Sequence, residues 1–266
     1  MIETLRKYIN LTRPVWVRGK RFRVPIWGGI EVPGIRSTRK TEIIARYARP
    51  GGVFIDVGVN LGQTLIDAKL NFPEIAYVGF EPNPICVAYV RQLVSANRFQ
   101  DCALIPAGLS DRAGLVRLHS APNQTVDHAS TLIESLRPQK TAAQFVTTLV
   151  FDDVFREISA APIGFVKIDV EGAELDVLKG MKSILAQDLP PIFCEVLPNA
   201  GGRDHTETES RRSELLALTR ALGYSMYHVE DHATDGINLR QIDRFREGPY
   251  QRGLSWDYLF LAGEPS

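Results

Sequence analysis

Apolar and polar positions follow two different periods along most of the chain. From residue 53 onward, short apolar runs typical of buried strands alternate with segments whose apolar residues recur at helical spacing. The seven predicted strands cover residues 53–57, 76–80, 103–105, 164–168, 192–196, 224–229 and 257–261. The predicted helices cover residues 63–70, 85–96, 173–185 and 210–221. This alternation predicts a doubly wound α/β domain with a mainly parallel, seven-stranded, Rossmann-like sheet.

The first 50 residues differ from the rest in pattern and in charge. They contain twelve Lys or Arg but only three Asp or Glu. Apolar and basic residues alternate around a central glycine over residues 15–24, which predicts a short β-hairpin with one wet face. Residues 37–47 then predict a helix. We therefore divide the chain into an N-terminal hairpin-and-helix extension, residues 1–50, and a main domain, residues 51–266.

Composition narrows the class of protein. Hydrophobic residues make up 44% of the 266 residues, and Lys plus Arg balance Asp plus Glu at 31 each. The resulting net charge of zero offers no electrostatic argument for nucleic-acid binding. The sequence has no apolar run near the ~18 residues of a membrane-spanning helix, no apolar region typical of a secretory signal, and only three scattered cysteines. We expect a cytoplasmic protein with no nucleic-acid partner and no stable membrane insertion, and the sequence indicates no oligomeric state.

Acidic residues follow most of the predicted parallel strands. In sheets of this kind, ligands bind at the carboxyl ends of the strands. Four of the five strand ends carry a carboxylate, and the fifth carries a glycine: these ends hold Asp56, Glu81, Gly108, Asp169 and Glu195. Solvation alone does not account for four acids at one edge, so we expect a polar ligand site there.

The turn after the first strand resembles a nucleotide-binding loop. It reads Asp56-Val57-Gly58-Val59-Asn60-Leu61-Gly62, and its glycines let the backbone turn sharply toward a ligand. Leu65 stands where a dinucleotide-binding loop has its third glycine, which weakens a diphosphate interpretation. Glu81, after the second strand, is placed to accept hydrogen bonds from a ribose diol. A purely structural turn and a helix N-terminal acid remain the alternatives.

Several blocks of the sequence together resemble one enzyme family. The blocks are Asp56 to Gly62, Phe80-Glu81-Pro82-Asn83, Thr148 to Asp153, Lys167-Ile168-Asp169-Val170-Glu171-Gly172-Ala173-Glu174 and Val177-Leu178-Lys179-Gly180. In order and spacing they resemble the FkbM-type S-adenosylmethionine-dependent methyltransferases over about residues 40–200. The sequence departs from the family pattern at Val59 and at Val150-Phe151. The resemblance implies a class I methyltransferase fold with S-adenosyl-L-methionine as cofactor.

The resemblance also implies which residues contact the cofactor. The turn after the first strand would hold the methionine part, with Asp56 near its ammonium group. Glu81 would bind the ribose hydroxyls, and Asp169 would stand beside the transferring methyl group. The full implied set is Asp56, Gly58, Asn60, Gly62, Glu81, Pro82, Asn83, Ala107, Gly108 and Asp169.

The acceptor side is predicted from the strand ends that follow. Methyl transfer to a hydroxyl needs alignment and a group that takes the proton. We predict catalytic roles for Asp169, Glu171 and His205, although a surface-loop histidine is the alternative for the last of these. Glu195 and Asn199 are predicted to bind acceptor hydroxyls. The acids could instead hold a divalent ion, but no spacing demands one, and we predict no metal.

The leading hypothesis is an O-methyltransferase that acts on a hydroxyl of a sugar, glycan or other polyhydroxyl small molecule. The acceptor class comes from the resemblance. The basic N-terminal segment suggests either an anionic acceptor or a merely solvated hairpin face. An NAD-dependent oxidoreductase remains open, although the missing glycine argues against it. A non-catalytic cofactor-binding module also remains open, although the acids on the acceptor side argue against that.

Overall fold

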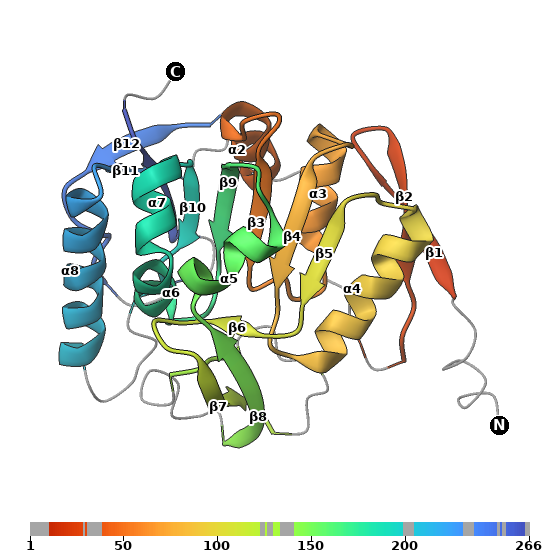
Figure 1. The fold of residues 1–266 in the computed structure, drawn as a ribbon, viewed down its shortest axis with the longest axis horizontal. Helices are drawn as coiled ribbons and strands as arrows, with labels where there is room; N and C mark the ends of the chain where they lie inside the picture. The colour runs from red at the N-terminus through yellow and green to blue at the C-terminus, as the bar shows by residue number, and fades with distance from the viewer. Residues whose placement is uncertain are drawn as a thin grey trace.

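A central sheet of eight strands organises the part of the chain that the structure describes (Figure 1). The computed structural model describes residues 11–28, 30, 39–122, 126, 130–133, 141–198, 205–230, 237–248, 251 and 254–263. In spatial order the strands are β12 (Leu239–Ile242), β11 (Ser225–Val229), β13 (Asp257–Leu261), β10 (Ile192–Glu195), β9 (Ile163–Ile168), β3 (Val53–Val57), β4 (Ala76–Phe80) and β5 (Cys102–Ile105).

The sheet is mainly parallel, as predicted, but it has one strand more than predicted. Parallel pairing joins β5, β4, β3, β9 and β10, whereas β13 lies antiparallel between β10 and β11. The additional strand is β12, which pairs antiparallel with β11 at the sheet edge. The predicted count of seven was wrong because this edge strand is short and half exposed. Its two apolar residues, Leu239 and Ile242, are separated by Arg240 and Gln241, so it lacks the apolar run by which the buried strands were found.

Helices cover both faces of the central sheet. One face carries α2 (Arg39–Tyr47), α3 (Gln63–Asn71) and α4 (Pro84–Asn97), and the other carries α5 (Phe151–Ile158), α6 (Glu174–Gly180), α7 (Lys182–Asp188) and α8 (His205–Ala221). Successive strand side chains point to opposite faces, so each strand supplies both cores. In β9, for example, Phe165 packs toward α3 and α4, and Val166 packs toward α6 and α7.

Two helical segments differ from the prediction. The single helix predicted over residues 173–185 is divided at Met181 into α6 and α7. Asp152 of α5 accepts hydrogen bonds from the backbone amides of Ser183 (2.8 Å) and Ile184 (3.0 Å), and so caps a new helix there. α5 itself was not predicted, because it is short and directly follows a strand-like run.

The predicted N-terminal hairpin is confirmed. β1 (Thr12–Val17) and β2 (Lys20–Pro25) pair antiparallel, and the chain turns through Gly19 at a φ of 76°. The hairpin packs on the α4 side, where the hydroxyl of Tyr89 donates to the carbonyl of Pro25 at 3.0 Å. The predicted helix is α2, although the start of the prediction lies outside the described residues. Hairpin and helix share a core with α3 and α4, and a domain boundary at residue 50 stays a prediction.

A small second sheet lies across the carboxyl ends of the central strands (Figure 1). Its strands are β6 (Gly108–Leu109), β8 (Ala142–Leu149) and β7 (Gly114–Ser120), in that order. Two backbone hydrogen bonds between His119 and Thr131 tie residues 130–133 to this sheet. Within the described ranges, no helix is both long and apolar enough to cross a membrane.

Candidate active site

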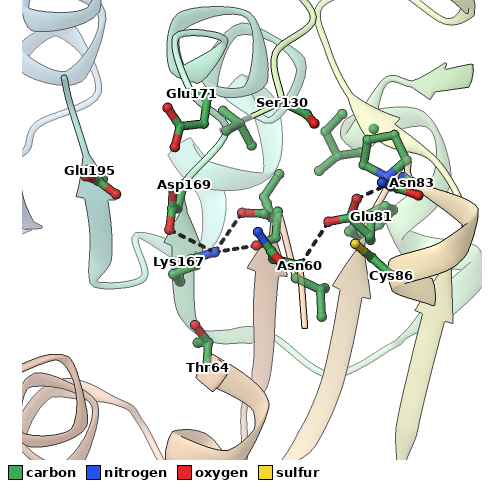
Figure 2. Close-up of a pocket in the computed structure, with 18 of the residues that line it drawn as sticks. Asn60, Thr64, Glu81, Asn83, Cys86, Ser130, Lys167, Asp169, Glu171 and Glu195 are labelled. Carbon is green, nitrogen blue, oxygen red and sulfur yellow. Dashed lines mark hydrogen bonds and ion pairs between the residues drawn. The ribbon is translucent and has the colours of Figure 1, made fainter. Parts of the chain in front are cut away.

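A cavity of about 310 Å³ lies at the carboxyl ends of β3, β4, β9 and β10. Residues of the small sheet and of residues 130–133 line its other side, so the small sheet forms a roof. The structure brings most of the predicted site residues to this one cavity (Figure 2). The predicted residues that line it are Gly58, Asn60, Glu81, Pro82, Asn83, Gly108, Asp169, Glu171 and Glu195.

Glu81 is held in one orientation by the backbone around it. The amide of Asn60 donates to one carboxylate oxygen and the amide of Asn83 to the other, each at 2.8 Å (Figure 2). Burial raises the pKa of Glu81, and these two hydrogen bonds oppose that shift. Each carboxylate oxygen keeps a second lone pair. The carboxylate can therefore accept a hydrogen bond from each hydroxyl of a diol in the cavity.

The turn after β3 approaches the end of β9 more closely than a side chain would allow. Gly58 has a φ of 81°, and a Cβ built on it would lie 2.0 Å from the backbone oxygen of Asp169. Asn60 also has a positive φ, of 52°, which turns its amide toward Glu81. Only glycine fits at position 58, and the close contact brings the turn and Asp169 to the same wall of the cavity.

Lys167 joins the two sides of this wall from beneath. Its ammonium group donates to the carbonyl of Gly58 at 2.6 Å and lies 3.6 Å from Asp169 (Figure 2). The same group lies 3.1 Å from the carboxylate of Asp56. Burial by itself would lower the pKa of Lys167, but the nearby carboxylates outweigh burial and raise it. Lys167 is therefore a charged group that fixes the turn, Asp56 and Asp169 relative to one another.

Asp169 and Glu195 form an acidic pair at the ends of neighbouring parallel strands. Burial would raise the pKa of Asp169, but the charge of Lys167 and a hydrogen bond with Glu195 hold it below its usual value. The negative charge of Asp169, together with burial, raises the pKa of Glu195 to about 10. At neutral pH the pair therefore carries one proton, which Glu195 holds while Asp169 is ionised.

Three predicted cofactor residues lie behind the cavity wall. The carboxylate of Asp56 faces Lys167 and the hydroxyl of Tyr77, because a fully buried acid needs such partners. Gly62 begins α3, where a Cβ would come within 2.7 Å of Leu93. Ala107 is buried outside the lining. The structure thus places these three residues outside the lining of the cavity, and their predicted contacts with the cofactor stay predictions.

Two predictions fall outside what the structure describes. Asn199 is not among the described residues, and only the backbone of His205 is described, at the start of α8. Their predicted roles in catalysis and acceptor binding stay predictions. Among the described residues, no group of three or more His, Cys, Asp or Glu is arranged to hold a metal ion.

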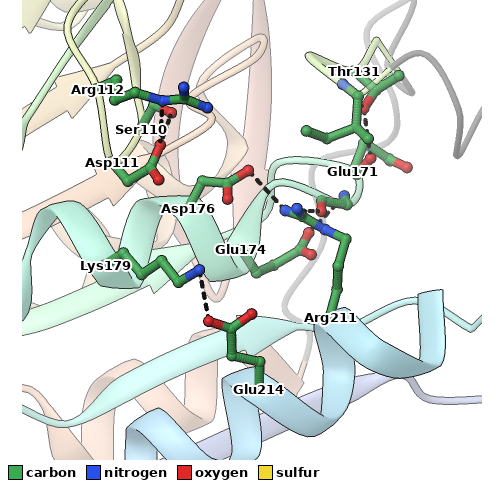
Figure 3. Close-up of polar contacts among 12 residues, drawn as sticks. Ser110, Asp111, Arg112, Thr131, Glu171, Glu174, Asp176, Lys179, Arg211 and Glu214 are labelled. Atoms are coloured by element: carbon green, nitrogen blue, oxygen red, sulfur yellow. Dashed lines mark hydrogen bonds and ion pairs between the residues drawn. The ribbon is translucent and has the colours of Figure 1, made fainter. Parts of the chain in front are cut away.

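A network of polar contacts holds the turn at Glu171 (Figure 3). Glu171 has a φ of 57°, and its carbonyl accepts a hydrogen bond from the hydroxyl of Thr131 at 2.8 Å. The amide of Gly172 donates to Glu174 at 2.8 Å, and Arg211 lies 2.7 Å from Asp176. The roof and α8 therefore both restrain the turn that presents Glu171 to the cavity.

Sequence reasoning missed several polar residues of this cavity. Lys167 was part of a quoted motif, but it was given no role; a lysine inside an apolar strand was the signal, because a buried ammonium needs partners. Lys40 and Thr64 also line the cavity. Nothing in their local sequence marks them, since α2 and α3 reach the cavity only through packing.

The fold and the cavity are those expected of an S-adenosylmethionine-dependent methyltransferase, and comparison with known proteins shows the family. A family model described as the methyltransferase FkbM domain matches residues 56–226, and the chain belongs to that family. The resemblance predicted from the motifs is therefore confirmed. Membership decides between the functions that the sequence left open, in favour of methyl transfer over NAD-dependent oxidation and over binding alone.

Individual relatives are moderately similar. The 31-O-demethyl-FK506 methyltransferase FkbM of Streptomyces tacrolimicus is 27% identical over 223 residues, which are 73% of this chain and 80% of that protein. The 2-O-methyltransferase NoeI of Sinorhizobium fredii is 25% identical over 170 residues, 60% of this chain and 69% of that protein. A solved structure of methyltransferase FkbM from Methylobacillus flagellatus KT is 14% identical with a TM-score of 0.47, and the match covers 83% of this chain and 50% of that one.

Proposed function

We propose that this chain is an O-methyltransferase that transfers the methyl group of S-adenosylmethionine to a hydroxyl of a polyhydroxyl small molecule, such as a sugar. The observation that carries the proposal is the fixed carboxylate of Glu81 in a cavity whose far side is acidic. The relatives support oxygen as the acceptor atom, because both names specify O-methylation. A cytoplasmic location remains part of the proposal.

The residues of the cavity fit the cofactor. Glu81 would bind the ribose diol, because each carboxylate oxygen has a lone pair left after its backbone hydrogen bond. Gly58 and Asn60 would follow the methionine part, and Asn83 and Gly108 would border the adenine. Because Asp56 is paired with Lys167, we assign Asp169 the contact with the positive part of the cofactor. When bound, S-adenosylmethionine supplies a methyl group on a positively charged sulfur.

Asp169 and Glu171 would act on the acceptor. A hydroxyl must lose its proton as its oxygen gains a methyl group, and it becomes strongly acidic at that moment. Even a carboxylate with a lowered pKa, such as that of Asp169, can then take the proton. Glu195, which holds its own proton, would donate a hydrogen bond to a second acceptor oxygen. His205 stays a candidate base.

The acidic lining favours an uncharged acceptor over an anionic one. Asp169 and Glu171 line the cavity, and an anion would meet like charge there. Basic residues of the hairpin bind within the protein instead: Arg18 pairs with Glu42 at 3.0 Å, and the ammonium of Lys20 donates to the carbonyl of Leu70 at 2.7 Å. The hydroxyls of a neutral polyol would instead donate hydrogen bonds to the acids.

Calorimetry with S-adenosylhomocysteine tests the cofactor site. We expect binding in the micromolar range or tighter. Glu81→Ala should weaken it about tenfold to hundredfold, the worth of hydrogen bonds to a charged group, and more than His205→Ala does. Glu74→Ala, at an exposed glutamate away from the cavity, is the matched control. A folded sample that fails to bind S-adenosylhomocysteine would refute the proposal.

The acceptor class needs a separate measurement. The chain is incubated with S-adenosylmethionine and a panel of neutral and anionic polyhydroxyl compounds, and mass spectrometry detects methyl ethers. We expect methylation of neutral members. Methylation confined to anionic members, or to atoms other than oxygen, would contradict the proposed acceptor.

A further inference from the structure

Lys40 and Thr64 are among the polar side chains of the cavity that have no role in the function proposed above. Lys40 projects from α2 of the N-terminal extension, and Thr64 lies in the first turn of α3. Both line the same cavity as Glu81 and Asp169. They therefore lie within reach of whatever the cavity binds.

The start of α3 has unused hydrogen-bond donors. Its N-cap is Gly62, which has no side chain to accept hydrogen bonds from the first-turn amides. Thr64 is only 3% exposed, yet its hydroxyl forms no hydrogen bond within the described residues. In Figure 2 this hydroxyl points toward the region of Lys167 and Asp169. A hydroxyl that lines the cavity without a protein partner, next to a helix N-terminus, is suited to a negatively charged ligand group.

Of the two cations that the described residues place in the cavity, one is available to a ligand. Lys167 is occupied by the carbonyls of Val57 and Gly58 and by two carboxylates. Lys40 forms no hydrogen bond or ion pair with the rest of the described chain, and its ammonium lies 5.7 Å from the ring centre of Phe193. The more distant groups that interact electrostatically with the Lys40 ammonium include the carboxyl groups of Asp169, Glu195 and Asp257. Lys40 thus keeps its hydrogen-bond donors for another partner.

We propose that Lys40, the hydroxyl of Thr64 and the N-terminus of α3 bind the α-carboxylate at the methionine end of S-adenosylmethionine. This inference rests on the proposed cofactor. That end of the cofactor carries one negative and two positive groups, and the carboxylate is its only anion. Asp169 faces the positive groups, so the negative group needs a cation and amide donors. Lys40 is the cation that the lining offers, and the N-terminal extension thereby completes the cofactor site.

The test compares two ligands that differ only in the carboxylate. One is S-adenosylhomocysteine, and the other is its decarboxylated analogue, in which an aminopropyl group replaces the amino-acid tail. Calorimetry with the full chain measures both for the wild type, Lys40→Met and Thr64→Val. Lys182→Met, at an exposed lysine outside the cavity, is the control.

We expect Lys40→Met to weaken S-adenosylhomocysteine about tenfold to hundredfold, because a charge-assisted hydrogen bond is lost. Thr64→Val, which keeps the side-chain shape, should weaken it several-fold. Neither variant should change the affinity for the decarboxylated analogue, which already binds the wild type more weakly. Lys182→Met should match the wild type with both ligands.

Other outcomes overturn the inference in distinguishable ways. If Lys40→Met binds S-adenosylhomocysteine as the wild type does, the carboxylate is bound elsewhere and the proposed function stands. If Lys40→Met weakens both ligands equally, Lys40 acts through the structure rather than on the carboxylate. If the folded wild type binds neither ligand, the proposed function itself fails.

Discussion

Replacing Lys167 by methionine removes the charge that holds the floor of the cavity together. Lys167 is 2% exposed, and its ammonium lies 3.1 Å from the fully buried carboxylate of Asp56. Methionine has a similar length, so packing is largely kept, but Asp56 is left with the hydroxyl of Tyr77 as its side-chain donor. Breaking a buried ion pair costs about 3–5 kcal/mol, because the remaining charge is uncompensated. We expect Lys167→Met to lower the free energy of unfolding by about this amount.

A double variant separates the charge from the packing. Asparagine at position 56 keeps an oxygen that accepts from Tyr77 but carries no charge, so adding Asp56→Asn to Lys167→Met should recover most of the lost stability. Urea unfolding near neutral pH, followed by far-ultraviolet circular dichroism, measures the wild type and both variants. A loss below about 1 kcal/mol in the single variant, or no recovery in the double variant, would refute the reasoning.

Three further predictions test other parts of the structure. Gly58→Ala should abolish S-adenosylhomocysteine binding and lower the melting temperature, because its Cβ would lie 2.0 Å from a backbone oxygen; Gly19→Ala, which also has a positive φ but no neighbour within 4 Å, should cost far less. Burial raises the pKa of Glu174 from 4.5 to about 7, so the folded chain binds the carboxyl proton of Glu174 more tightly than the unfolded chain does. This proton binding stabilises the fold fully below pH 4.5, and the stabilisation is lost as the pH rises through 7. The Glu174→Gln side chain cannot ionise, so its free energy of unfolding in urea should rise relative to that of the wild type by on the order of 3 kcal/mol between about pH 5 and about pH 8. A difference between the two proteins that stays constant with pH would contradict this prediction. Asp152→Ala should lower the unfolding free energy by ~1 kcal/mol through the lost cap of α7, and an unchanged urea midpoint would show that the cap contributes nothing.

The fold could be predicted where burial leaves a period in the sequence. The buried strands β3, β4 and β9 are short apolar runs, and their bounds match the predicted ranges to within one residue. The edge strand β12 could not be found this way, because its residues face solvent as much as protein. The break between α6 and α7 was also hidden, since the carboxylate that caps α7 comes from Asp152, about thirty positions earlier in the chain.

The site divides in the same way. The sequence alone determined which strand ends carry acids and where the backbone must turn, because both features are visible in short runs of neighbouring residues. The tertiary structure decided which acids meet a ligand and which meet a lysine. Asp56 and Asp169 both follow buried strand residues. Only the packing shows that Asp56 is paired with Lys167 behind the wall, whereas Asp169 lines the cavity. The tertiary structure also placed Lys40 at the cavity. The approach of α2 to the cavity depends on contacts between distant segments, which local residue patterns do not encode.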